Sequence, residues 1–323
     1  MEDIAKKLSV FISHLKPKII FDKTCLAVNC SKESIRSHSI QEKQLRHIAK
    51  DGKVLSLTKF PGTLQEEGVG EASTFRGFCN FHDSDFFKEI EERNYNKEEK
   101  QNFLFAFRAL TKELVAKKKI IALHKAALTL NKEEFNKFSN KSLISFSEFK
   151  KNRGIIEDFL KGEKEALEKL SSRKKAMLIN LNKERYWKIK SKIFTFDQKS
   201  AFLANSFFLL EKDWNGEVVN NIELFKDIHP LFLNVITQEG KTFVIFSFFN
   251  KDKRIYSSKI DGLLNSNKQK QKLIISRILA NYVENIFFNP EETELINVFK
   301  EYFKKNIYIR EEINEVESLN LFR

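Results

Sequence analysis

The middle of the chain repeats apolar residues at the period of a helix. Between Lys97 and Leu130 there is no Gly or Pro. The apolar positions of this stretch are spaced by close to 3.6 residues, and they are Phe103, Phe107, Leu110, Leu114, Ile121 and Leu123. The pattern therefore predicts one long helix over residues 97–130.

Two capping patterns follow that helix. Asn131 with Glu134, and Ser145 with Glu148, place an acid three residues after a capping side chain, which predicts two further helix starts. Residues 155–192 are helix-like again. We therefore expect antiparallel helices that form an extended arm or a bundle.

The last third of the chain changes to a β pattern. Residues 231–236 and 242–248 are apolar runs around a turn signal at 238–240, which predicts a β-hairpin. An earlier strand is expected at 206–210, before a turn at 213–216. Helices are predicted near the end over 273–288 and 298–309, before an acidic, exposed segment at 311–317.

These patterns predict an α+β protein in three parts. The expected domains are an N-terminal unit (1–95), a basic helical region (96–194) and a small α+β domain with a β-hairpin (195–323). The last domain contains no Gly-rich phosphate loop and no nucleophile elbow. We therefore expect it to have a structural role or to recognise a protein partner.

The hydropathy pattern argues against a membrane protein. The longest apolar stretch, near 242–249, is far shorter than the roughly 18 residues that a membrane span requires. The N-terminus has an acidic start and no signal-peptide pattern, so we expect a cytoplasmic protein without a membrane partner.

The positive charge is concentrated in the middle third. The net charge is about +1 over residues 1–100, about +13 over 101–200 and about −1 over 201–323. Such a block indicates either a solvated helical face or a surface that contacts the phosphates of DNA or RNA. Trp187 lies within the basic run and is expected to anchor the core, although an aromatic ring among cations can also stack on bases. The candidate nucleic-acid contacts are Lys117, Lys118, Lys119, Arg173, Lys174, Lys175, Arg185 and Lys188.

The chain has three cysteines, all in its first quarter. Cys25 and Cys30 form a C-x4-C pair, and Cys79 with His82 forms a C-x2-H pair. Two short pairs that each offer two ligands suit a tetrahedral Zn²⁺, whereas the alternative is three reduced core thiols and a surface histidine. The sequence therefore predicts a structural zinc site that stabilises the N-terminal unit.

The order of these residues resembles the HNH, or His-Me finger, nuclease superfamily. The resemblance covers residues 20–90: a first ligand pair, then Ser37-His38-Ser39-Ile40, then the second pair followed by Asp83. The same segment is also similar to a set of bacterial proteins without an assigned activity. The resemblance implies a treble-clef or HNH-like zinc-knuckle fold.

The resemblance also implies roles for individual residues. His38 corresponds to the general base, and an imidazole suits that role because its pKa lies near neutral pH. Asp83 would hold a catalytic Mg²⁺ or Mn²⁺, and Arg36 or Arg76 would clamp the scissile phosphate. The chain departs from the family pattern at Asp83, where the family has Asn, and at Phe86 and Phe87, where it has His.

Three functional hypotheses follow. The first is a zinc-stapled, metal-dependent HNH-like nuclease that acts on nucleic-acid phosphodiesters. The second is a non-catalytic zinc-finger nucleic-acid-binding or adaptor protein, in which His38 has a structural role. A third, which rests on the resemblance alone, is a component of a bacterial defence system.

Overall fold

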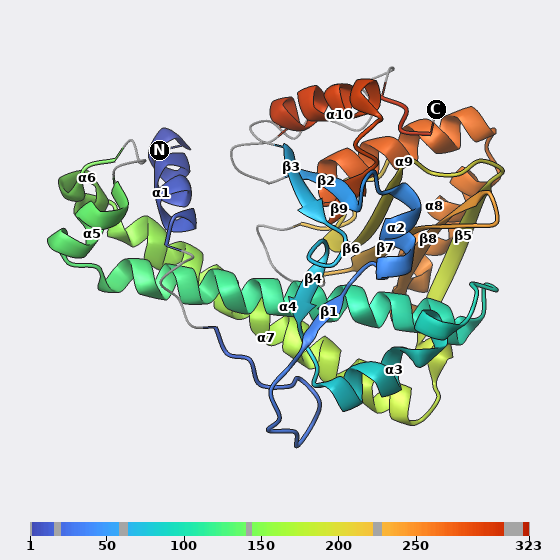
Figure 1. Cartoon of the computed structure of the whole chain (residues 1–323), viewed down its shortest axis with the longest axis horizontal. Coiled ribbons are helices and arrows are strands. Elements are labelled where there is room, and N and C mark those ends of the chain that lie inside the picture. Colours follow the sequence, from blue (N-terminus) through green and yellow to red (C-terminus); the bar gives the residue numbers. More distant parts are fainter. Residues whose placement is uncertain are drawn as a thin grey trace.

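The computed structural model describes residues 2–15, 21–57, 64–139, 144–221, 228–306 and 319–322. The predicted α+β class is confirmed, with long helices in the middle and a sheet that contains the C-terminal strands (Figure 1). The strands are β1 (Arg36–His38), β2 (Lys53–Leu57), β3 (Leu64–Gly68), β4 (Thr74–Arg76), β5 (Ile189–Phe196), β6 (Phe202–Leu209), β7 (Pro230–Gln238), β8 (Lys241–Phe249) and β9 (Ile286–Phe288). The α-helices are α1 (Glu2–Ser13), α2 (Glu42–Ile48), α3 (Asn80–Glu92), α4 (Glu99–Thr129), α5 (Lys132–Ser139), α6 (Phe146–Lys151), α7 (Arg153–Asn182), α8 (Lys253–Leu264), α9 (Lys268–Tyr282) and α10 (Thr293–Asn306). Two short 3₁₀ helices are η2 (Tyr186–Lys188) and η3 (Asn250–Asp252).

A seven-stranded sheet forms the body of the molecule, with the order β3-β2-β9-β6-β7-β8-β5 and antiparallel pairs throughout its described ladder. Successive side chains of a strand point to opposite faces. On β7, Leu231 and Leu233 face a core that includes α8 and α9, whereas Phe232 and Ile236 face a core that includes α4. Helices therefore cover both faces, which explains why these strands are nearly continuous apolar runs in the sequence.

Helices α4 and α7 run side by side and form an arm that extends away from the sheet (Figure 1). The first part of α4 is buried between the sheet and α3, and α7 packs along its length. At the far end of the arm, α1, α5 and α6 form a separate apolar cluster around Phe11, Phe135 and Phe149. The arm thus links a small helical cluster to the body.

Several predicted elements are confirmed. The long helix predicted over 97–130 is α4, and Ser145 and Glu148 form a reciprocal capping box at the start of α6. The predicted hairpin is β7–β8, and its turn residues Glu239 and Gly240 both have positive φ angles, of 51° and 74°. A two-residue turn with both φ angles positive matches the right-handed twist of the strands that it joins.

Two predicted helices are too long. Over 155–192 the helix ends at Asn182, because Glu184 adopts a left-handed conformation (φ 51°), and β5 begins at Ile189. Over 273–288 the helix ends at Tyr282, and residues 286–288 form β9 between β2 and β6. Pairing with strands that are distant in the sequence overrides the local helical pattern there.

Two other predictions have different outcomes. Trp187, expected in the core, is 44% exposed, and the Lys188 Nζ lies 4.2 Å from the centre of its ring. The end of the helix predicted over 298–309 and the acidic segment 311–317 lie outside the described residues.

The first third of the chain is spread over three parts of the molecule. Helix α1 belongs to the helical cluster, and β2 and β3 extend the large sheet through β9. The segment from 21 to 38 packs against β4 and the start of α3. The three domains expected from the sequence remain a prediction. The elements of the first of them pack in three different places, so neighbours in the sequence are not neighbours in the fold. Within the described ranges, no helix combines the length and the apolar character needed to cross a membrane.

The aromatic core at β9 yields a stability prediction. Phe288 is fully buried, and its ring centre lies 4.9 Å from that of Phe299 and 6.2 Å from that of Phe202. Phe288→Ala should lower the free energy of unfolding by about 3–5 kcal/mol, because it leaves a cavity where two strand pairs meet. Urea denaturation measures this loss. Phe159→Ala, at a site that is 47% exposed, is the control and should change the free energy far less.

Candidate metal centre

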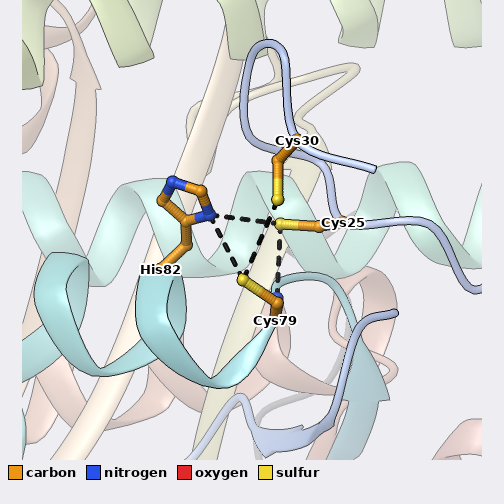
Figure 2. A group of neighbouring side chains, drawn as sticks. All are labelled: Cys25, Cys30, Cys79 and His82. Carbon is orange, nitrogen blue, oxygen red and sulfur yellow. Dashed lines mark hydrogen bonds between the residues drawn. The ribbon is translucent and has the colours of Figure 1, made fainter. Parts of the chain in front are cut away.

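Four side chains from two distant segments meet beside α3. One donor atom from each of Cys25, Cys30, Cys79 and His82 lies within 4.8 Å of the others. The His82 Nδ1 is 3.3 Å from the Cys79 Sγ and 3.5 Å from the Cys25 Sγ, and the Cys30 and Cys79 sulfurs are 4.0 Å apart. Figure 2 shows the four side chains pointing toward one another, two from the loop and two from the start of the helix.

The loop that presents Cys25 and Cys30 is held by backbone hydrogen bonds. The Cys25 N–H donates to the Lys32 carbonyl at 2.9 Å, which closes the loop on itself. The Leu26 N–H donates to the Gly77 carbonyl at 2.9 Å, which docks the loop onto the segment before Cys79. A Cβ at Gly77 would come within 2.7 Å of the Phe75 ring and 3.1 Å of the Thr111 side chain, so glycine lets these two side chains pack closely against the backbone here.

The other pair is positioned by α3 and the short β1–β4 ladder. β4 pairs antiparallel with β1, and the chain then passes through Gly77 and Phe78 to Cys79, the N-cap of α3. His82 follows in the first turn, so one turn of helix brings its ring to the thiol. Phe78 is fully buried against α3 and α4, which fixes the start of the helix.

The two buried thiols differ in their acidity. A hydrogen bond from the backbone of His82 lowers the pKa of the Cys79 thiol to about 7. Burial raises the pKa of Cys25, although the Cys79 N–H donates to the Cys25 Sγ at 3.2 Å and partly offsets this. A metal ion binds thiolates and so competes with protons for these sulfurs.

The donor set fits Zn²⁺. Three sulfurs and one imidazole nitrogen are a common ligand set of structural zinc sites, and sulfurs about 2.3 Å from a tetrahedral ion lie roughly 3.8 Å apart. The 4.0 Å between Cys30 and Cys79 is close to that separation. The residues predicted from the sequence as ligands are thus the ones that the fold brings together, and they could hold one metal ion.

His38 lies at the end of β1, in the ladder that β1 forms with β4. Its Nε2 is 3.0 Å from the Val69 carbonyl oxygen, so this nitrogen donates a proton and Nδ1 keeps its lone pair. The side chain is half-buried. The ring is therefore held in one tautomer by a backbone group.

Asp83 follows His82 in the first turn of α3 and is half-buried. Burial raises the pKa of its carboxyl, and the charge of Arg108, the Ser37 hydroxyl and the charge of His38 act in the opposite direction. Arg108 on α4 is almost fully buried, stacks 4.2 Å from the centre of the Phe87 ring, and lies 2.6 Å from Glu91. The Asp83 Oδ1 is buried and, among the described residues, makes no hydrogen bond of regular geometry.

No protein-family model, curated protein or solved structure matches this chain. Its function has to be inferred from the geometry of the site and of the surrounding surface.

The two arginines predicted to bind a phosphate, Arg36 and Arg76, instead pair with acidic side chains and a backbone carbonyl of the protein itself. Arg36 forms an ion pair with Glu71 on the surface. Arg76 donates from its Nη1 to the Ser34 carbonyl at 2.6 Å and lies 3.5 Å from Glu33. Both guanidinium groups therefore brace the β1–β4 ladder.

The predicted nucleic-acid contacts divide into two groups. Lys117 pairs with Glu163 at 2.5 Å, Arg173 donates to the Ile228 carbonyl at 2.9 Å, and Lys174 donates to the Leu26 carbonyl at 2.7 Å. These three side chains join elements of the fold. Lys118 also pairs with Asp22, at 3.2 Å, and the half-buried Lys188 lies over the Trp187 ring, whereas Lys119, Lys175 and Arg185 are exposed.

Sequence reasoning missed Arg108, which is central to the Asp83 environment. A signal was present, because Arg108 is the one charged residue in the apolar run Phe103-Leu-Phe-Ala-Phe-Arg-Ala-Leu110. A charge within such a run has to be paired or stacked when the run is buried. The identity of its partners depends on how α3 crosses α4.

The cluster gives a direct metal prediction. The purified protein should hold one zinc ion per chain. Cys30→Ser should lose this ion, and its free energy of unfolding should fall by roughly several kcal/mol, because zinc binding is coupled to folding. Elemental analysis and thermal melts with and without a chelator measure both effects. His47→Gln, at an exposed histidine on α2, should retain the zinc and the chelator response. Full stability of Cys30→Ser, with no chelator effect on the wild type, would contradict a structural metal.

Proposed function

We propose that this chain is a nucleic-acid-binding protein whose finger, the segment formed by residues 21–38 and 74–92, is stapled by zinc. The observation that supports the proposal best is that the basic third of the sequence forms the α4–α7 arm, against which the finger packs. The partner would be an extended polyanion that follows this arm, because phosphate contacts supply most of the affinity of such complexes.

Zinc has a structural role in this proposal. The four side chains would supply all four ligands of a tetrahedral ion, as in structural zinc sites, and would leave no position for water or substrate. The ion would fix the loop at 25–30 to the start of α3, and Lys174 of α7 donates to the carbonyl of Leu26 in that same loop. The zinc site would therefore hold the finger in a fixed position on the arm.

The surroundings of Asp83 do not fit a second divalent cation well. Mg²⁺ and Mn²⁺ prefer several oxygen ligands, and carboxylates above all. The charge that lowers the pKa of the Asp83 carboxyl most is that of the buried Arg108, which also pairs with Glu91. The guanidinium thus supplies the positive charge that a metal ion would supply, and this favours a binding protein over a metal-dependent nuclease.

The binding proposal predicts a salt-dependent interaction. Zinc-loaded protein should bind a fluorescent oligonucleotide of about 20 residues, and log K should fall linearly with log salt, by about 0.7–0.9 for each phosphate contacted. Fluorescence anisotropy measures the slope. Polyglutamate of similar charge is the control competitor and should displace the oligonucleotide poorly. The proposal is wrong if no DNA or RNA, single-stranded or duplex, binds in a salt-dependent manner.

A second candidate, an HNH-like nuclease, is favoured by the geometry of His38. The Val69 carbonyl holds the ring in the tautomer that leaves Nδ1 free to accept a proton. In such an enzyme a water molecule would lose its proton to Nδ1 as its oxygen attacks phosphorus, and the bond to the leaving oxygen would then break. The Asp83 Oδ1, which makes no hydrogen bond of regular geometry within the described part of the chain, is an acceptor that the site could offer to a divalent ion.

A cleavage assay separates the two candidates. If the nuclease candidate is right, labelled DNA or RNA should be cut in Mg²⁺ or Mn²⁺, and His38→Ala should be slower by about 10²–10⁴-fold, as expected for loss of a general base. His47→Ala is the control histidine variant. Cleavage that His38→Ala leaves unchanged, or its absence in the wild type, rejects the nuclease and leaves the binding function standing.

A further inference from the structure

A cleft of about 620 Å³ lies where the finger meets the arm. One wall is the segment from Phe21 to Leu26, which leads into the metal-binding loop, and the other is formed by α4 with Leu167 of α7. Leu26 directly follows the metal-site residue Cys25, so the cleft begins beside the finger.

The rim of the cleft is strongly basic. The basic side chains that line it are Lys23, Arg76, Lys118, Lys119 and Lys125, and the acidic one is Asp22. Asp22 is 3.2 Å from Lys118 and is thereby neutralised. Lys125 is exposed and forms no hydrogen bond or ion pair with any residue that the structure describes, so its charge is available to a ligand.

The floor of the same cleft is apolar. The side chains of Leu26, Val115, Ile121, Ala122 and Leu167 contribute to it. Phe21 lies at its wall, half-buried, and the Lys119 Nζ is 5.7 Å from the centre of the Phe21 ring. A ring flanked by a cation is a suitable surface for stacking a planar heterocycle.

We propose that this cleft binds a single-stranded nucleic acid, with the phosphates along the basic rim and one or more bases against Phe21 and the apolar floor. Single strands expose the faces of their bases, and proteins bind them with aromatic platforms inside positively charged grooves. A duplex keeps its bases stacked and presents phosphates to its surroundings, so an apolar concave floor would gain nothing from it. This inference rests on the proposed binding function and specifies its site and its ligand.

The cleft also changes which basic residues are expected to contact phosphates. Lys119 stays as a contact from the sequence prediction, and Lys125 joins it through the fold. Lys118 lies 3.2 Å from Asp22, and Lys23 and Arg76 each lie 3.5 Å from Glu33, so acids partly offset the charge that these three add to the rim. Lys117, Arg173 and Lys174 serve intramolecular contacts. The phosphate path thus runs along α4 toward the loop at 25–30.

The test compares variants on labelled 12-residue oligonucleotides of DNA and RNA, each single-stranded and as a duplex. Lys119→Gln with Lys125→Gln should weaken single-strand binding by on the order of tenfold and flatten the salt slope by about 1.4, since each lost phosphate contact removes about 0.7. Phe21→Ala should weaken binding roughly fivefold or more and leave the salt slope unchanged, because stacking releases no counterions.

The matched control removes the same two charges elsewhere. Lys251→Gln with Lys253→Gln changes exposed residues at η3 and α8, outside the cleft, and should bind as the wild type does. Equal weakening by both charge pairs, or tighter binding of duplex than of single strand, overturns the cleft assignment while the binding function itself stands. Binding of DNA and RNA alike supports phosphate and stacking recognition, and a preference for RNA adds a contact to the 2′-hydroxyl.

Discussion

The closure of the Cys25, Cys30, Cys79 and His82 side chains around one point is the constraint on which the finger depends. The two ligand pairs are about fifty residues apart, and bringing them together costs only a logarithmic loop-closure entropy. The closure fixes the relative positions of the loop at 25–30, the start of α3 and the backbone at Gly77. These features set the position of the finger on α4, and with it one wall of the basic cleft.

Helix α4 is in contact with most other parts of the molecule. Its first half is buried on nearly all sides and contacts the sheet, the finger and α7, whereas its second half leaves the body and presents lysines to solvent. Arg108 lies in the buried half, where stacking on Phe87 and pairing with Glu91 offset the cost of burying its charge. The same arrangement places a positive charge next to Asp83, so a contact that stabilises the fold also shapes the chemistry of the candidate site.

The resemblance to HNH nucleases rests on residues that are close in the sequence, and the part of it that the structure supports is the cluster of three cysteines and one histidine. The four metal-site residues lie together, and His38 lies at the end of β1, in a two-stranded ladder with β4 that precedes α3. The pKa of the Asp83 carboxyl, by contrast, depends on burial, on the charge of Arg108 and on the Ser37 hydroxyl, and no short motif describes these influences. A motif specifies residues that are close in sequence, whereas the electrostatics of a carboxylate depend on whatever packs against it.

The sequence by itself determined the features that depend on local spacing: the long helix α4, the capping box at Ser145, the β7–β8 turn and the two ligand pairs at residues 25–30 and 79–82. Only the tertiary structure decided the features that depend on distant partners. It ended α7 before β5, made residues 286–288 a strand between β2 and β6, joined β2 and β3 to the large sheet, and separated the lysines that hold the fold from those that line the cleft. The physical reason is that helical periodicity and capping act within a few residues, whereas strand pairing, ion pairs and clefts depend on segments that are distant in the sequence.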